Sequence, residues 1–239
     1  MKRIARHTNR VTSAVPQPVT IFVTEAISVS GLWQCAPESK ASLVLAHGAG
    51  AGMHHPFLAG VANELEGLGV ATLRYQFPYA ERHGKRPDPP ALCHATVRAA
   101  VGAALQLAPR LPLFAGGKSF GGRMTSQAQA ALPLAEVLGI VFLGFPLHPP
   151  KQPSEARAEH LFKVGIPLLF LQGTQDAFAE LSLLQPLAMR LGERATLMLF
   201  QDADHSFHVP ARTGRTDAQV QTAVLNALAS WIDSIIAGD

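Results

Sequence analysis

Residues 113–122 read LFAGGKSFGG, and this stretch contains the pattern Gly-x-Ser-x-Gly at positions 117, 119 and 121. A short apolar run leads into the pattern, and a segment of helical character begins near Gly121. A sharp turn from a strand into a helix leaves no room for side chains two positions before and after its central residue. Glycine at both positions avoids these clashes, and Gly122 gives the backbone after the turn additional freedom. The pattern therefore predicts a strand, a tight turn that presents the Ser119 hydroxyl, and a helix; the alternative is a glycine-rich turn with an incidental serine.

Short apolar runs alternate with segments of helical period along the rest of the chain. We expect strands at 19–25, 27–34, 42–46, 70–75, 113–116, 137–145, 167–172 and 196–200, and helices at 58–68, 91–108, from 121, at 181–191 and from 216. The alternation is typical of an α/β protein with a mostly parallel, doubly wound sheet and helices on both faces. We predict about seven or eight strands, the first two forming an antiparallel hairpin. Because residues 147–164 form only a short irregular excursion, we expect a minimal cap domain or none.

The length and composition indicate one compact domain. The chain has 239 residues, of which 48% are hydrophobic and 15% charged, a balance that suits a buried α/β core. We expect a single domain at 18–239, preceded by a loosely ordered basic tail at 1–17. The two cysteines, Cys35 and Cys93, are too few for a disulfide framework, and we expect both thiols to be reduced.

Charge and hydropathy argue against two classes of partner. Much of the net charge of +3 lies in the tail and in a loop at 81–86, and no basic stripe is interleaved with aromatic residues, so we expect no nucleic acid. No apolar run approaches the roughly 18 residues that a membrane-spanning helix needs, so we expect no membrane. No apolar signal core follows the basic N-terminus, and we therefore expect a cytoplasmic protein. The oligomeric state is left open.

A nucleophilic serine needs a general base, and the base needs a carboxylate to orient it. Asp176 follows the expected strand at 167–172, and His205 follows the one at 196–200. The carboxyl ends of neighbouring parallel strands lie at the same edge of a sheet, where open α/β folds place their sites. We expect His205 to take the proton of Ser119 and Asp176 to hold the imidazole.

Three other residues compete for these two roles. His208 is a rival for the base, but it lies farther from the end of its strand. Asp202 and Asp204 are rivals for the acid, but both precede His205 so closely that reaching around to its ring is awkward. We therefore favour His205 and Asp176.

Acyl transfer also needs N–H donors aimed at the oxygen that becomes negative. We expect one from the backbone of Phe120 and the other from Ala49, in the loop HGAGAG at 47–52. The same loop could instead cradle a phosphate. It lacks the Gly-Lys-Ser/Thr ending of a P-loop and the full spacing of a dinucleotide site, so we favour the oxyanion interpretation.

Several polar residues and glycines near the expected strand ends are candidates for lining the pocket: His47, Gly48, Gly50, His54, Tyr79, Lys118 and His148. For His54, Tyr79 and His148 the alternative is an ordinary surface position. A metal site built from His54, His55 or the pair His205 and His208 would lack a third ligand at a recognisable spacing. We therefore expect no metal and no cofactor.

These motifs together resemble a known family. The matching segments are HGAGAGM at 47–53, FPY at 77–79, GKSFGGR at 117–123, PLHPP at 146–150, GTQD at 173–176 and DHSF at 204–207. They resemble the α/β-hydrolases, in the branch of bacterial dienelactone-hydrolase-like proteins and eukaryotic relatives of the third subunit of the NSL histone-acetyltransferase complex. The resemblance covers residues 20–237 and implies an α/β-hydrolase fold with Ser119, Asp176 and His205 as nucleophile, acid and base.

The sequence departs from that family at two positions. Dienelactone hydrolases proper use a cysteine nucleophile where this chain has Ser119, so their substrate does not carry over, and His54 stands where an acidic residue is expected. We expect a cofactor-free hydrolase of a small-molecule carboxylic ester or thioester with a small to medium acyl group. The alternatives are a peptidase or amidase with the same three residues, and a non-catalytic binding or scaffold protein, as the NSL-type relatives look to be.

Overall fold

The computed structural model describes residues 14–238. The basic tail expected at 1–17 lies mostly outside these residues, and its last residue, Gln17, already belongs to the first strand. Residues 1–13 and 239 are not described further.

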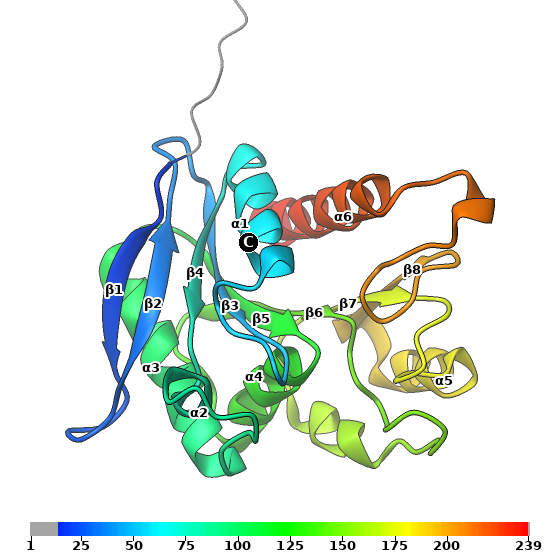
Figure 1. Ribbon diagram of the computed structural model, residues 1–239, viewed down its shortest axis with the longest axis horizontal. Coiled ribbons are helices and arrows are strands. Elements are labelled where there is room, and N and C mark those ends of the chain that lie inside the picture. Colours follow the sequence, from blue (N-terminus) through cyan, green and yellow to red (C-terminus); the bar gives the residue numbers. More distant parts are fainter. Residues whose placement is uncertain (1–13, 239) are drawn as a thin grey trace, which may run out of the picture.

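An eight-stranded sheet forms the centre of the molecule, with the strand order β1-β2-β4-β3-β5-β6-β7-β8 (Figure 1). The strands are β1 (Gln17–Phe22), β2 (Ser28–Gln34), β3 (Ala41–Ala46), β4 (Val70–Tyr75), β5 (Leu113–Lys118), β6 (Val137–Leu143), β7 (Leu168–Gly173) and β8 (Ala195–Phe200). Strands β1 and β2 form the expected antiparallel hairpin, and β2 also pairs antiparallel with β4. All the other pairings are parallel. The predicted α/β class and strand number are confirmed.

Helices cover both faces of this sheet. They are α1 (Pro56–Gly67), α2 (Pro78–Glu81), α3 (Pro90–Leu107), α4 (Phe120–Ala131), α5 (Leu181–Leu191) and α6 (Asp217–Gly238), with short 3₁₀ helices η1 (Ala156–Lys163), η2 (Gly192–Arg194) and η3 (Ala211–Thr213). In Figure 1, α1 and α6 lie on one side of the sheet, and α3, α4 and α5 lie on the other. Strands β3, β4 and β7 are buried along their whole length, as expected for parallel strands covered on both sides.

The helices dock through apolar stripes that recur at helical spacing. Leu58, Val61 and Leu65 of α1 are fully buried against the sheet, as the spacing predicts. On the opposite face, Val97 of α3 and Met124 of α4 are buried in a second core. Burying one such side chain contributes about 1.5–3 kcal/mol, so these stripes fix where the loops between strands and helices emerge.

Helix α6 differs from the expectation that no apolar run is long enough to cross a membrane. It has 22 residues, and its most apolar 18-residue window has a mean hydropathy of 1.3, which is sufficient by length and composition alone. Polar residues are scattered along α6, so the sequence shows no continuous apolar run at this helix. The core helices of globular proteins meet the same criterion, and in α6 Val220, Val224 and Leu228 pack into the core beside α1.

The excursion at 147–164 contains η1, which the sequence did not predict. Ala158 and Leu161 of η1 are fully buried in the core formed by β6, β7 and α5. The Ser126 hydroxyl of α4 lies 2.7 Å from Nε2 of His160, which ties η1 to the side of α4. The excursion is therefore packed against the main body and forms no cap domain.

Candidate active site

Ser119 lies at the sharp turn between β5 and α4. Its backbone angles, φ 51° and ψ −116°, are unfavourable for a residue with a side chain. A Cβ atom on Gly117 would lie 2.3 Å from the carbonyl oxygen of Ala46, and one on Gly121 would lie 2.6 Å from that of His47. Glycine at both positions is therefore a steric requirement of the turn.

The same close approach gives a stability prediction for Gly121. Gly121→Ala is expected to lower the free energy of unfolding by about 3 kcal/mol or more, because the obstructing atoms belong to the backbone. Gly102→Ala is the matched control: no atom lies within 4 Å of its added Cβ in α3, so it should gain about 1 kcal/mol. Urea unfolding of both variants measures the difference, and a loss below about 1 kcal/mol for Gly121→Ala would contradict the packing argument. Gly122 is also constrained, since its Cβ would lie 2.8 Å from the carbonyl oxygen of Gly117.

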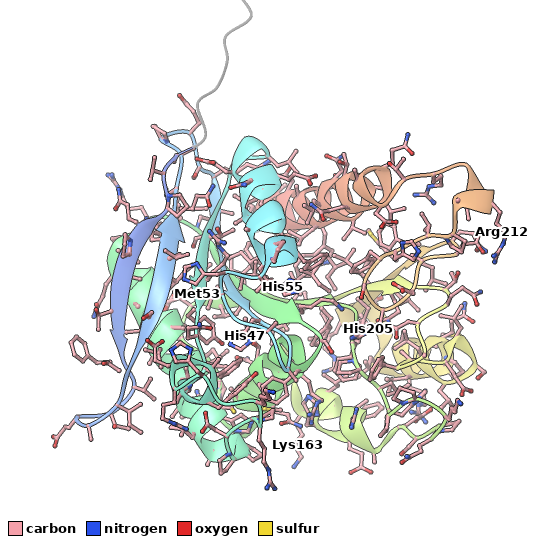
Figure 2. The ribbon with its side chains drawn as sticks, viewed as in Figure 1. His47, Met53, His55, Lys163, His205 and Arg212 are labelled. Atoms are coloured by element: carbon pink, nitrogen blue, oxygen red, sulfur yellow. The ribbon has the colours of Figure 1, made fainter. Side chains whose placement is uncertain are left out.

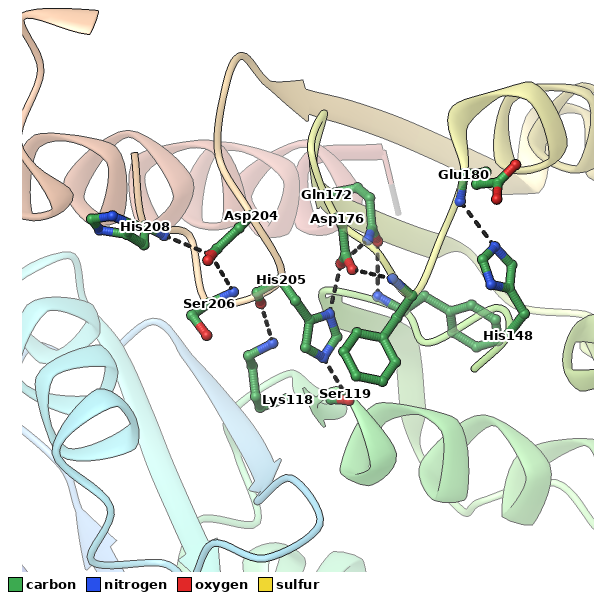
Figure 3. Close-up of polar contacts among 12 residues, drawn as sticks. Lys118, Ser119, His148, Gln172, Asp176, Glu180, Asp204, His205, Ser206 and His208 are labelled. Atoms are coloured by element: carbon green, nitrogen blue, oxygen red, sulfur yellow. Dashed lines mark hydrogen bonds and ion pairs between the residues drawn. The ribbon is translucent and has the colours of Figure 1, made fainter. Parts of the chain in front are cut away.

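Two hydrogen bonds join the three residues that the sequence places at strand ends (Figure 3). His205 Nε2 lies 2.8 Å from Ser119 Oγ, and His205 Nδ1 lies 2.6 Å from Asp176 Oδ2. Since the ionised carboxylate can only accept, Nδ1–H donates to Asp176 and Nε2 is left to accept the serine O–H. The arrangement can take a proton from Ser119 and stabilise the resulting imidazolium.

Asp176 is held by two further donors. The Phe178 N–H donates to Asp176 Oδ1 at 2.8 Å, and Gln172 Nε2 donates to Oδ2 at 2.5 Å. The other end of the Gln172 amide accepts from the Phe145 N–H at 2.8 Å. Sequence reasoning missed Gln172 as a positioning residue. The available signal was a polar residue in an otherwise apolar buried strand, four positions before the candidate acid.

The rival residues make other contacts. Asp204 Oδ1 accepts from the N–H groups of Ser206 and His208 at 2.7 and 3.0 Å, so it closes the turn that carries His205 (Figure 3). His208 lies on the surface with Nδ1 2.9 Å from Asp217, and this hydrogen bond raises the pKa of His208. Asp202 accepts from the side chain of Gln201. None of these three contacts involves the Ser119 hydroxyl.

Lys118 reaches from the strand end to the loop that carries His205. Its Nζ donates to the carbonyl oxygen of His205 at 2.5 Å and lies 5.7 Å from the centre of the Phe207 ring. Burial lowers the pKa of Lys118 to about 8, while the charges of Asp176 and Asp204 act in the opposite direction. The Lys118 ammonium therefore helps to hold the loop that carries His205. Its burial costs free energy, because the charged group loses contact with water.

This burial predicts a pH dependence of stability. The unfolded chain keeps the Lys118 proton up to about pH 10.5, whereas the folded chain releases it near pH 8. The unfolded state therefore binds more protons in this window, and raising the pH removes a penalty of about 3 kcal/mol. The free energy of unfolding of wild type should rise relative to Lys118→Met between pH 8 and 10.5.

The control for this prediction is Lys163→Met, whose side chain extends away from the body of the molecule (Figure 2). Urea unfolding across the pH range compares each variant with wild type. Lys163→Met should keep a constant difference from wild type, since its ammonium is exposed in both states. A difference for Lys118→Met that stays flat from pH 7 to 10.5 would show that Lys118 is not buried as a charged group.

The loop after β3 and the start of α4 each present an unused N–H group next to Ser119. Within residues 14–238 the amides of Ala49 and Phe120 donate no hydrogen bond. Both residues border the same cavity as Ser119. Free N–H groups at this place can receive an oxygen that becomes negative on attack by Ser119.

His47 is buried beneath this loop and does not line the pocket, contrary to expectation. Its Nδ1 lies 2.8 Å from the Gly48 carbonyl oxygen, and its Nε2 accepts from the Phe77 N–H at 3.2 Å. Burial lowers the pKa of His47, which favours the neutral ring that these two bonds require. His47, labelled in Figure 2, is fully buried, and its two contacts fix the loop that carries Ala49.

His148 and Tyr79 are two further corrections, because both are buried. His148 Nδ1 lies 2.8 Å from the Pro149 carbonyl oxygen, and Nε2 accepts from the Glu180 N–H at 3.1 Å (Figure 3). Tyr79 packs edge-to-face on Phe120 with ring centres 6.4 Å apart, and burial raises the pKa of its phenol to about 12. Both side chains are therefore packed beneath the site and line neither cavity at Ser119.

Of the remaining residues predicted to line the pocket, some border the cavity at Ser119 and others lie away from it. Gly48 and Lys118 border the cavity at Ser119, whereas Gly50 does not. His54 borders a separate hollow beside β1 and β2, and its neighbour His55 faces the Ser119 cavity instead. His55 also accepts from the Phe57 N–H at 3.2 Å, which explains its place at the start of α1.

Two cavities meet at Ser119. The first, of about 390 Å³, is mainly apolar and lies between Phe57, Leu58 and His205; we call it the histidine-side cavity. The second, of about 430 Å³, extends over the start of α4 to Arg123 and Arg157; we call it the arginine cavity. Ala49, Ser119 and Phe178 border both. Over the described part of the chain, no group of three or more His, Cys, Asp or Glu side chains is placed to hold a metal ion.

The sheet, the strained serine turn and the hydrogen-bonded residues at the strand ends define an α/β hydrolase. The chain belongs to this family, because the family model described as the alpha/beta hydrolase domain matches residues 39–233. The expected membership is confirmed, and residues 14–238 contain no cap domain, in agreement with the expectation of a minimal one or none. The relation to the NSL subunit stays a prediction.

Solved structures share this fold over almost the whole chain. Dienelactone hydrolase from Anabaena variabilis has a TM-score of 0.74 at 20% identity, covering 93% of this chain and 99% of that chain. An α/β serine hydrolase without lid from Xanthomonas campestris has a TM-score of 0.69 at 19% identity, covering 90% and 94%. Est1E from Butyrivibrio proteoclasticus has a TM-score of 0.68 at 15% identity, covering 92% and 99%. At these identities the likeness establishes the fold.

Proposed function

We propose that this chain is a serine hydrolase that cleaves a carboxylic ester or thioester with a small to medium acyl group. The observation that carries the proposal is the pair of hydrogen bonds from Ser119 through His205 to Asp176. A nucleophile, a base within hydrogen-bond reach and a carboxylate that orients the base are what an activated serine requires. The two cavities are large enough for a small-molecule ester.

The geometry supports a two-stage reaction. In the first stage His205 Nε2 takes the Ser119 proton as Oγ attacks the acyl carbon, and the oxygen that becomes negative accepts from the N–H groups of Ala49 and Phe120. Each such donor commonly lowers the barrier by about 3 kcal/mol. His205 then gives its proton to the leaving alcohol or thiol, while Asp176 stabilises the imidazolium. In the second stage His205 Nε2 takes a proton from water as the water oxygen attacks the acyl carbon. His205 then gives that proton to Ser119 Oγ, and the acid is released.

A panel of substrates tests this function. The panel contains 4-nitrophenyl esters of acetic, butyric and octanoic acid, the matching acyl thioesters of N-acetylcysteamine, and the matching 4-nitroanilides. We expect hydrolysis of esters and thioesters with the shorter chains preferred, and much slower cleavage of the anilides. Preference for the anilides would favour a peptidase or amidase. Hydrolysis of none of the panel would favour a non-catalytic binding protein and overturn the proposal.

A further inference from the structure

The arginine cavity has an electrostatic character that the proposed reaction does not explain. Arg123 lies on α4, one turn after Ser119, and Arg157 lies on η1, which packs beside α4 (Figure 1). The two positions are 34 residues apart in the sequence, and the fold brings them to the wall of one cavity. That cavity opens directly onto Ser119.

In the described part of the chain, neither guanidinium has a partner of opposite charge. Among residues 14–238 Arg123 makes no side-chain hydrogen bond or ion pair, and its Nε is buried without any acceptor. Its nearest aromatic contact is the Phe120 ring, whose centre lies 5.8 Å from Arg123 Cζ. The side chain of Arg157 is half-buried and also lacks an ion pair within the described residues. The pKa of Arg123 is lowered first by burial and then by the neighbouring charge of Arg157. Both guanidinium groups border the same cavity without an ion pair to any described residue.

The one acid on the described wall of this cavity is already engaged. Asp88 Oδ2 accepts from the Tyr79 N–H at 2.6 Å, and Asp88 Oδ1 forms an ion pair with Arg82 at 2.7 Å. His160 on η1 adds no negative charge, and burial lowers its pKa to about 4. Holding two unpaired cations in a partly dry cavity costs free energy unless a ligand supplies the counter-charge. A forked guanidinium pairs best with a carboxylate or phosphate group.

The position of His205 assigns this cavity to the acyl part of the substrate. His205 must return its proton to the leaving oxygen or sulfur, so the leaving group departs on the side of His205. His205 borders the histidine-side cavity and not the arginine cavity. The leaving group therefore occupies the histidine-side cavity, and the acyl chain extends from Ser119 toward Arg123 and Arg157.

We propose that the acyl group of the substrate ends in an anionic oxygen group, carboxylate or phosphate, which pairs with Arg123 and Arg157. The substrate class is then the monoester or monothioester of a dicarboxylic acid, or its phosphorylated counterpart. This inference rests on the proposed function, since it assumes attack by Ser119 on the acyl carbon. It adds a preference for a negatively charged acyl group over a neutral one, which the serine, histidine and aspartate alone do not impose.

Matched anionic and neutral esters test this preference. Mono-4-nitrophenyl succinate, glutarate and adipate are compared with the neutral 4-nitrophenyl butyrate, pentanoate and hexanoate, using wild type, Arg123→Gln, Arg157→Gln and Arg110→Gln. We expect wild type to prefer at least one anionic ester over its neutral match in kcat/KM. Each cavity variant should lower the anionic-to-neutral ratio by roughly 10- to 100-fold, as expected for losing a hydrogen bond to a charged group. Arg110→Gln removes an exposed charge before β5, at the opposite end of the strand from Ser119, and should keep the wild-type ratio.

Two outcomes overturn the inference while leaving the proposed function intact. The first is equal hydrolysis by wild type of all the neutral esters and their anionic matches. The second is an equal loss for both classes in the Arg variants, which would assign the arginines a structural role. A second arm does not depend on turnover: calorimetric titration of monomethyl glutarate, and of inorganic phosphate, into Ser119→Ala and into Ser119→Ala with Arg157→Gln. Tighter binding of the glutarate assigns the carboxylate, and tighter binding of phosphate assigns the phosphorylated acid. Binding that Arg157→Gln leaves unchanged overturns the inference. Failure of ester hydrolysis together with arginine-dependent binding overturns the proposed function and leaves the arginine cavity as an anion-binding site.

Discussion

Replacing Ser119 with alanine is expected to lower kcat for the best ester by about 10⁴- to 10⁶-fold, with little change in folding stability. The Ser119 hydroxyl is the only nucleophile placed against His205 Nε2 in the described structure, at 2.8 Å. Alanine removes Oγ but keeps the Cβ that the turn already accommodates. The residual rate should come from the N–H groups of Ala49 and Phe120 and from substrate binding, as in other enzymes of this type.

Ser182→Ala is the control for this variant. Ser182 is exposed on α5, borders neither cavity at Ser119, and makes no side-chain hydrogen bond in the described part of the protein. Steady-state kinetics should give a wild-type kcat for Ser182→Ala, and urea unfolding should confirm that Ser119→Ala is folded. A Ser119→Ala protein that keeps more than a tenth of the wild-type kcat would rule out an acyl-Ser119 intermediate.

Asp176→Asn is expected to lower kcat by about 10⁴-fold. The Asp176 side chain is fully buried and accepts three hydrogen bonds, from His205, Gln172 and the Phe178 backbone. An amide has one accepting oxygen in place of two, and its NH₂ group would face a donor. The imidazole would then lose the partner that fixes Nδ1–H, so Nε2 would no longer be held ready to take the Ser119 proton.

Asp202→Asn is the matched change for this prediction. Asp202 is one of the rival acids, and its φ of 61° is a conformation that asparagine tolerates well. Kinetics on the same ester should give a loss for Asp176→Asn that is thousands of times larger than the loss for Asp202→Asn. Equal losses, or a larger loss at Asp202, would contradict the assignment of Asp176 as the partner of His205.

The parts of this structure that the sequence predicted are those governed by local rules. Gly117 and Gly121 predict the serine turn, because a larger residue at either position would clash with the backbone at the end of β3. Asp176 and His205 were found because parallel strands end at one edge, so residues that follow two neighbouring strands meet there. These inferences need only the positions where successive strands end, which the apolar runs give directly.

The parts that the sequence could not give depend on which way a side chain turns. His47 and His148 follow strands as His205 does, but each is turned inward to bond two backbone groups. His54 and His55 differ by one position, and only the start of α1 decides which one faces Ser119. The arginine cavity joins residues from α4 and η1, and η1 has no clear helical period in the sequence. The cytoplasmic location stays a prediction from the sequence.

Reaction with a fluorophosphonate tests the role of Ser119 most directly. Trypsin cleaves after Lys118 and Arg123, so peptide 119–123 (SFGGR) carries the hydroxyl of Ser119 and no other. We predict that mass spectrometry of the intact protein shows one adduct, that this peptide carries it, and that Ser119→Ala and His205→Ala remain unlabelled. An unlabelled wild-type protein, or an adduct on any other peptide, would contradict the assignment of Ser119 as the nucleophile.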